Sequence, residues 1–251
     1  MKTIVITQAR SNSTRLPNKV LMKIEGKTLL QIHVDRIKQA NNVSEVIIAT
    51  TINKVDDVIV DLANELKVEV FGGSENDVLD RFYQAVKGKK ADFVVRLTSD
   101  CPLIDPKLLD EMIEAAQEKN LDYYSNVLQE KYPDGQDVEV FTFSALEKAW
   151  KEATLKSDRE HVTPYIRTNS SYNGGNLFQS ENHNLKEDYS KVRLTVDEAK
   201  DFEVMELIIG NLGIDKDWKS YANYYLENKE IQKINGSIIR NEGYLKSLKE
   251  D

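Results

Sequence analysis

The sequence contains one cysteine, Cys101, among its 251 residues, which excludes an intrachain disulfide and any zinc site built from several cysteines. It also lacks long apolar runs: residues 45–52, among the longest, fall far short of the roughly 18 residues that cross a bilayer. The apolar run within residues 1–6 is too short for a secretory signal. With 34 Lys and Arg against 42 Asp and Glu, the net charge of −8 argues against general nucleic-acid binding. We therefore expect a cytoplasmic globular protein with neither a membrane nor a nucleic acid as its partner.

Short apolar runs alternate with amphipathic runs through the first two thirds of the chain. This alternation predicts βαβ units and a three-layer α/β/α sandwich around a mostly parallel sheet. Runs rich in Val, Ile and Phe predict buried strands at 3–7, 45–50, 68–71 and 92–97. Helical spacing of apolar residues predicts helices at about 28–40, 55–66, 76–85 and 106–116.

The pattern changes from about residue 121 onward, where turn residues interrupt short extended runs. Further strands are predicted at 123–126, 138–143 and 192–196, and helices at 144–153, 201–212 and beyond 217. No repeat or linker divides the chain. We therefore expect a single domain, 1–251, with an irregular insertion at 123–190 and a C-terminal helical segment at 217–251.

The segment 8–19 follows the first predicted strand, at the carboxyl edge where open α/β sheets bind ligands. It carries Arg10, Arg15 and Lys19 together with three hydroxyl side chains and no acidic residue. Such a set of donors suits a polyphosphate. The segment contains no glycine, which excludes the GxGxxG and GxxxxGK[ST] phosphate loops. The alternative is a solvated basic loop, but its place after a buried strand favours ligand binding.

The pattern Gln-Ala-Arg-x-x-Ser-x-Arg-Leu-Pro-x-Lys in this segment resembles a loop of the CMP-sugar synthetases. These are the acylneuraminate and 3-deoxy-manno-octulosonate cytidylyltransferases, and the similarity is greatest to their relatives in the SpsF family of spore coat polysaccharide biosynthesis proteins. Asn12 and Asn18 stand where relatives often have glycine, and Asn tolerates positive φ better than most residues. Glu198-Ala199 replaces a common Thr-Pro. The similarity continues through 77–82, 96–106, 132–141, 160–166, 193–197 and 240–244.

The resemblance implies a Rossmann-like nucleotidyltransferase fold and a cytidylyltransferase. Such an enzyme would use CTP and Mg²⁺ to transfer CMP onto a 2-keto sugar acid, such as a nonulosonate or octulosonate, for surface polysaccharide synthesis. Pyrophosphate would be released. Arg10, Arg15, Lys19 and Asp100 would be catalytic. The residues expected to bind the nucleotide are Gln8, Ala9, Arg10, Ser11, Ser13, Arg15, Lys19, Ala49, Thr50 and Ser99.

Two aspartates follow predicted strands, Asp100 after 92–97 and Asp197 after 192–196. Carboxylates at the carboxyl ends of strands can converge on one ion, and hard oxygen ligands suit magnesium. The resemblance implies that these two aspartates hold Mg²⁺ against the phosphates. Either could instead cap a following helix.

The acceptor sugar is less readable than the nucleotide. Asp137 and Glu139 share one face of a predicted strand, although a solvated strand face is the plain alternative. Glu160 and His161 begin a predicted helix, and Arg193 could meet an acceptor anion. The family context favours acceptor contacts for all five residues.

The family also implies a homodimer with contacts from the region 123–190. Two other functions stay open: a glycosyltransferase that consumes a nucleotide sugar, and a non-catalytic nucleotide-binding partner subunit.

Overall fold

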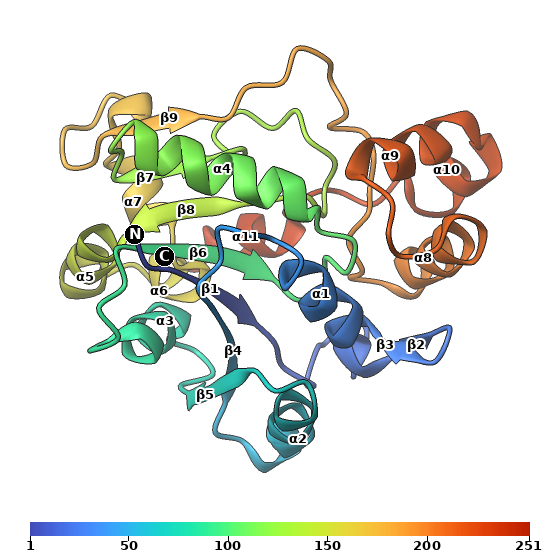
Figure 1. Ribbon diagram of the computed structural model, residues 1–251, viewed down its shortest axis with the longest axis horizontal. Helices are drawn as coiled ribbons and strands as arrows, with labels where there is room; N and C mark the ends of the chain where they lie inside the picture. Colours follow the sequence, from blue (N-terminus) through green and yellow to red (C-terminus); the bar gives the residue numbers. More distant parts are fainter.

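The structure, a computed structural model, describes all residues, 1–251. Its strands are β1 (Thr3–Gln8), β4 (Glu45–Thr51), β5 (Glu69–Gly73), β6 (Phe93–Thr98), β7 (Tyr123–Ser125), β8 (Glu139–Thr142) and β9 (Ser180–Asn182), with a separate ribbon of β2 (Lys23–Ile24) and β3 (Lys27–Thr28). The main sheet has the order β5-β4-β1-β6-β8-β7-β9 (Figure 1), and only β8 runs antiparallel to its neighbours. The predicted, mostly parallel sheet is confirmed.

Helices cover both faces of the sheet, which confirms the three-layer prediction. They are α1 (Leu29–Ile37), α2 (Asp57–Glu65), α3 (Val78–Val86), α4 (Pro106–Glu118), α5 (Phe143–Glu152), α6 (Lys156–His161), α7 (Pro164–Thr168), α8 (Ala199–Leu212), α9 (Trp218–Glu227), α10 (Lys229–Asn235) and α11 (Glu242–Ser247). One buried apolar cluster joins α1, α4, α8 and α9 to one face, and another joins α3, α5 and α7 to the opposite face. Figure 1 shows α8, α9 and α10 grouped at one end of the molecule.

Local chemistry explains where several helices begin. The Asp77 carboxylate accepts the N–H of Asp80 at 2.9 Å and caps α3. The Asp105 carboxylate caps α4 by accepting the N–H of Lys107 at 2.8 Å, just before a proline that suits the first helical turn. Polar side chains therefore fix the helix starts that follow β5 and β6. No helix in the structure combines the length and apolar character that crossing a bilayer requires.

Residues 192–196 form no strand of the sheet, contrary to the prediction. The segment is extended, but it pairs with the turn at Asp134 through only two backbone hydrogen bonds, of 2.9 and 2.7 Å. It then pairs with Asp100, whose carbonyl accepts the Val196 N–H at 2.8 Å. Because the neighbouring segments are loops, they offer isolated hydrogen bonds rather than a ladder. The last of these bonds brings Asp197 beside Asp100.

Glu160 and His161 end a helix rather than begin one, which also differs from the prediction. The chain leaves α6 at Val162, whose φ of +74° stops the helix, and α7 starts at Pro164. The two side chains therefore belong to the last turn of α6.

The turn at Gly135 predicts a stability test. Its φ is +109°, and a Cβ there would lie 2.6 Å from the backbone of Leu194. We expect Gly135→Ala to lower the free energy of unfolding by about 3 kcal/mol, because positive φ and a backbone clash add. Gly174→Ala is the control: its φ is +83° but nothing lies within 4 Å, so about 1 kcal/mol is expected. Urea denaturation measures both, and equal losses would contradict the packing argument.

Candidate active site

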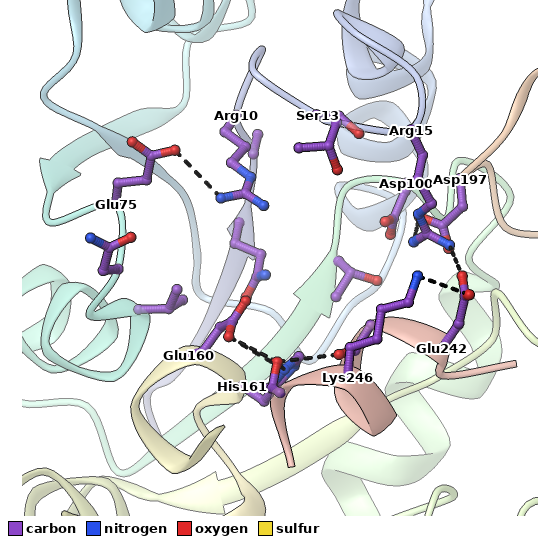
Figure 2. Close-up of a pocket in the computed structure, with 18 of the residues that line it drawn as sticks. Arg10, Ser13, Arg15, Glu75, Asp100, Glu160, His161, Asp197, Glu242 and Lys246 are labelled. Carbon is purple, nitrogen blue, oxygen red and sulfur yellow. Dashed lines mark hydrogen bonds and ion pairs between the residues drawn. The ribbon is translucent and has the colours of Figure 1, made fainter. Parts of the chain in front are cut away.

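A cleft of about 530 Å³ opens at the carboxyl ends of β1 and β6. Figure 2 shows it between the loop 8–19, the start of α3, the end of α6 and α11. Only three of its 23 lining residues are hydrophobic, so the cleft suits a highly polar ligand. Of the residues predicted from sequence, the structure brings into the lining Gln8, Ala9, Arg10, Ser13, Arg15, Lys19, Asp100, Glu160, His161 and Asp197.

Hydrogen bonds to buried groups hold the loop 8–19 in place, so it is not a freely solvated basic loop. The Asp56 carboxylate accepts the backbone N–H and the hydroxyl of Ser11 at 2.7 and 2.6 Å. The Ser11 carbonyl accepts the N–H of Asn18 at 2.8 Å. Asn18 has a φ of +58°, as the glycine preference of relatives predicts, whereas Asn12 has no positive φ. Ser11 therefore anchors the loop and does not line the cleft.

Lys19 is the centre of the site, because its ammonium lies between the two predicted metal ligands. Its Nζ donates to Asp100 Oδ2 at 2.7 Å and to Asp197 Oδ1 at 2.8 Å. Arg15 adds an ion pair to the same Asp197 oxygen at 2.9 Å. The side chains of Lys19, Asp100 and Asp197 are only 12, 24 and 20% exposed. Three segments far apart in sequence thus meet through one buried charge.

The charges at this centre shift each other's proton affinity. Burial opposes the charge on Lys19, but the carboxylates of Asp100 and Asp197 outweigh it and raise the pKa of the ammonium. Burial alone would raise the pKa of Asp100, yet Lys19 holds that pKa well below its ordinary value. Lys19 and Asp100 are therefore both ionised at neutral pH.

Arg193 and its carboxylate partners hold Asp197 in position. Arg193 grips Asp201 with two donors at 2.8 and 2.9 Å, binds Asp134 at 2.6 Å, and reaches Asp197 Oδ2 at 3.4 Å. Asp201 also accepts the backbone N–H of Asp197 at 3.0 Å. Since the guanidinium is buried and satisfied by carboxylates, it is not available to an acceptor anion, and the predicted acceptor role of Arg193 does not fit the structure.

The other predicted acceptor residues divide between the cleft and the interior. Asp137 accepts from Arg240 at 2.6 Å and Glu139 from Arg96 at 2.6 Å, and neither lines the cleft. Only Glu139 lies on a strand, because β8 begins there and Asp137 precedes it. Each of the two carboxylates balances an arginine. Glu160 and His161 do line the cleft, and the Ser247 hydroxyl lies 2.9 Å from each of them.

His161 is neutral at physiological pH. Burial, together with the charge of Arg96, lowers the pKa of His161 to about 4. A neutral imidazole can accept or donate one hydrogen bond, so it can orient a sugar hydroxyl.

The remaining predicted nucleotide residues lie beneath the loop. The Ser99 hydroxyl donates to the Gln8 carbonyl at 2.6 Å, and Ala49 accepts the N–H of Ala9 at 3.0 Å. Thr50 is fully buried, and its hydroxyl has no partner, as is also true of Gln8 Oε1. Ala49, Thr50 and Ser99 thus support the floor of the site without reaching into the cleft.

Sequence reasoning missed Arg81, at the end of the cleft where Arg10 and Glu75 face each other (Figure 2). Nη1 of Arg81 donates to the Ser74 carbonyl at 2.9 Å, whereas its Nε has no hydrogen-bond partner. No carboxylate lies within ion-pair distance of the Arg81 guanidinium. Burial and the nearby Arg10 lower the pKa of Arg81 to about 10. It therefore remains a cation and offers unused donors beside the cleft.

Sequence reasoning predicted the C-terminal helical segment 217–251 but missed that α11 lines the cleft, although residues 240–244 carried part of the resemblance. Glu242, Lys246 and Ser247 line the cleft, and Glu242 lies 3.6 Å from Arg15. The only available signal was the resemblance itself, because the sequence pattern of a charged C-terminal helix does not predict that the helix packs beside the cleft.

Comparison with known proteins agrees with this geometry. A family model described as Cytidylyltransferase matches residues 4–234. The chain belongs to the cytidylyltransferase family. This cytidylyltransferase is 43% identical over 243 residues to an uncharacterised protein of Methanocaldococcus jannaschii, covering 95% of this chain and 96% of that one. It is 33% identical over 215 residues to the spore coat polysaccharide biosynthesis protein SpsF of Bacillus subtilis, covering 84 and 87%.

A solved cytidylyltransferase structure from Leptospira borgpetersenii superposes with a TM-score of 0.86 at 33% identity, covering 96% of this chain and 99% of that one. The resemblance to SpsF-like cytidylyltransferases is therefore confirmed, as is the Rossmann-like nucleotidyltransferase fold. The protein is a CTP-dependent nucleotidyltransferase.

The pair of aspartates fits a divalent cation that arrives with a nucleotide. Both carboxylates approach one nitrogen within 2.8 Å, so their oxygens converge on a single cation. No group of three or more Asp, Glu, His or Cys side chains is arranged to hold a metal. Mg²⁺ is commonly bound by one or two carboxylates together with substrate phosphates. Asp100 and Asp197 match that set.

The Lys19 centre predicts a pH-dependent stability effect. Lys19→Met leaves two carboxylates facing each other without their ammonium, so we expect a loss of about 3 kcal/mol in the free energy of unfolding at pH 7. Because Lys19 lowers the folded-state pKa of Asp100, this stabilisation is present above about pH 4 and is lost as the pH falls further.

Urea denaturation at pH 7 and at pH 3 measures the effect. Lys27→Met is the control, because Lys27 pairs with Asp35 at the surface and should cost less than about 1 kcal/mol. A Lys19→Met penalty that is the same at both pH values would contradict the ionised centre.

Proposed function

We propose that this cytidylyltransferase uses CTP and Mg²⁺ to transfer CMP onto an acidic sugar and releases pyrophosphate. The observation that carries the proposal is the meeting of Lys19 and Arg15 with Asp100 and Asp197 at the carboxyl edge of the sheet. Cations for the phosphates and carboxylates for the metal lie side by side there. A triphosphate needs both.

In the proposed reaction a hydroxyl oxygen of the acceptor sugar attacks the α-phosphorus of CTP in line and gives up its proton to water. The bond from that phosphorus to the bridging oxygen breaks, and pyrophosphate leaves on the opposite side. Arg10, Arg15 and Lys19 bind the triphosphate and offset the charge of the leaving pyrophosphate. The work of the protein is mostly positioning and electrostatic stabilisation, so no covalent enzyme intermediate is needed.

Mg²⁺ would be held by Asp100 and Asp197, where it supplies positive charge to the phosphate oxygens when bound. Lys19, which lies between these carboxylates, is then free to turn toward the phosphates. Its four-carbon stem and three donors allow that change of partner.

The acceptor end of the cleft contains Glu160, His161 and α11. Carboxylate, imidazole and hydroxyl groups suit sugar hydroxyls, and the resemblance to 3-deoxy-manno-octulosonate cytidylyltransferases supports a 2-keto sugar acid. A role in surface polysaccharide synthesis and a homodimer with contacts from 123–190 remain predictions. A glycosyltransferase has no specific support, because the residues after Asp100 are Cys101 and Pro102 rather than the second acid of an Asp-x-Asp pair.

Asp100→Asn tests the proposed metal role. The variant keeps its hydrogen-bonding shape but loses the charge, so CTP-dependent pyrophosphate release should fall on the order of 100-fold. Pyrophosphate release by the wild-type enzyme and by the variant is measured with CTP, Mg²⁺ and each acid of a panel that contains 3-deoxy-manno-octulosonate and N-acetylneuraminate. Asp35→Asn, outside the cleft, is the control. Near-normal turnover by folded Asp100→Asn would remove this carboxylate from the mechanism.

Arg15→Ala tests the phosphate role of the loop. Loss of a charged donor is expected to raise the KM for CTP by about 10- to 100-fold. The KM for the acceptor should change much less. Initial rates at varied CTP measure this, and unchanged CTP kinetics would count against the assignment of the loop.

A further inference from the structure

Arg167, on α7, has an unusual environment for an arginine. Its guanidinium makes no hydrogen bond and has no carboxylate within ion-pair distance. Its one close partner is an aromatic ring, with Cζ 5.2 Å from the centroid of Tyr244 on α11. The residue is half-buried, and none of its guanidinium nitrogens is both fully buried and unpaired. These donors therefore keep some contact with solvent and are available to an acceptor.

No carboxylate near Arg167 forms an ion pair with it. Glu139 is the first carboxylate to raise the pKa of Arg167 against the opposing effect of burial. Yet Glu139 is already bound by Arg96 at 2.6 Å and by the Tyr123 hydroxyl. Glu130 and Asp158 also interact with the charge of Arg167, but neither pairs with it. A partly buried cation without an ion-pair partner of its own is costly. The arrangement favours an anion from outside.

The Tyr244 ring separates Arg167 from the cleft. The same ring meets His161 edge-on, with centroids 5.0 Å apart and an interplanar angle of 77°. His161 lines the cleft together with Lys246 and Ser247 of α11, and Figure 2 shows His161 and Lys246 at the same end. Removal of the ring would therefore open Arg167 to the acceptor end of the cleft.

The attachments of α11 permit such a movement. Arg240 anchors the preceding segment firmly, through Asp137 at 2.6 Å and the Tyr132 carbonyl at 3.0 Å. The helix itself is held by the Ser247 hydroxyl, 2.9 Å from both Glu160 and His161, and by pairs at the cleft rim, such as the 3.6 Å pair of Glu242 with Arg15. Partly exposed pairs of this kind contribute little. A tilt of the helix would therefore break few strong contacts, while Arg240 would keep the preceding segment in place.

We propose that Arg167 is the subsite for the carboxylate of the acceptor acid, and that the Tyr244 ring occupies this subsite until the acid displaces it. This inference rests on the proposed function. A carboxylate matches the planar fork of a guanidinium with two charged hydrogen bonds, which are stronger than a cation–π contact at a partly exposed site. Arg193 cannot serve, because Asp134 and Asp201 already occupy it.

The test uses steady-state kinetics with CTP, Mg²⁺ and whichever panel acid, 3-deoxy-manno-octulosonate or N-acetylneuraminate, wild-type enzyme turns over faster. Arg167→Met should raise the KM for the acid by about 10- to 100-fold and leave the KM for CTP unchanged. Arg167→Lys should recover part of the loss. Tyr244→Leu should lower the KM for the acid about two- to fivefold. Structural damage alone would instead raise this KM.

The methyl ester of the same acid separates carboxylate recognition from other effects. Wild-type enzyme should discriminate strongly between acid and ester, and Arg167→Met should not. Arg159→Met is the matched control, because Arg159 has its own carboxylate, Asp77, at 2.6 Å and does not line the cleft.

The outcomes distinguish the two proposals. Absence of pyrophosphate release by wild-type enzyme with every acid would contradict the proposed function. Wild-type turnover with an unchanged acid KM in Arg167→Met, or with equal rises in both KM values, would overturn the Arg167 subsite alone. If Arg167→Met does not fold, Arg167→Lys and Tyr244→Leu decide, and unchanged acid KM values in both would overturn it.

Discussion

The site depends on one largely buried ammonium, that of Lys19. Lys19 joins two carboxylates that are 97 positions apart, Asp100 and Asp197, and neither carboxylate could be buried beside the other without a cation between them. Asp197 does not lie on a strand, so its position comes from Arg193 and Asp201 behind it. In the proposed reaction a divalent ion and a triphosphate would replace the ammonium with little rearrangement, because the carboxylates already converge.

The two ends of the cleft differ in how firmly they are built. At the nucleotide end, buried side chains such as Asp56 and Ser99 tie the loop 8–19 to the ends of β4, β1 and β6. At the proposed acceptor end, α11 follows the firmly bound Arg240 and is itself held by Ser247 and by partly exposed pairs such as Glu242 with Arg15. A rigid phosphate site beside an adjustable sugar site would let one scaffold serve different acceptor acids while CTP stays the common substrate.

Much of the fold and half of the site could be predicted from the sequence. Parallel buried strands leave continuous apolar runs, and the carboxyl edge of such a sheet locates the loop 8–19 and Asp100 without further information. The partners of Arg193 could not be predicted, because Asp134 and Asp201 reach it only through tertiary packing. Arg81 and Arg167 were missed for the same reason: an arginine that lacks a counter-ion is recognisable only once every neighbour has been placed.

Binding of Mn²⁺, followed by its EPR signal, tests the central claim most directly, because Mn²⁺ accepts the oxygen ligands that suit Mg²⁺. The account predicts that the wild-type protein binds Mn²⁺ weakly alone and tightly when CTP is present. In the double variant Asp100→Asn, Asp197→Asn, the protein should not increase the affinity for Mn²⁺ beyond that of CTP in free solution. Wild-type affinity for Mn²⁺–CTP in a folded double variant would contradict the convergence of these two carboxylates on the metal of the nucleotide.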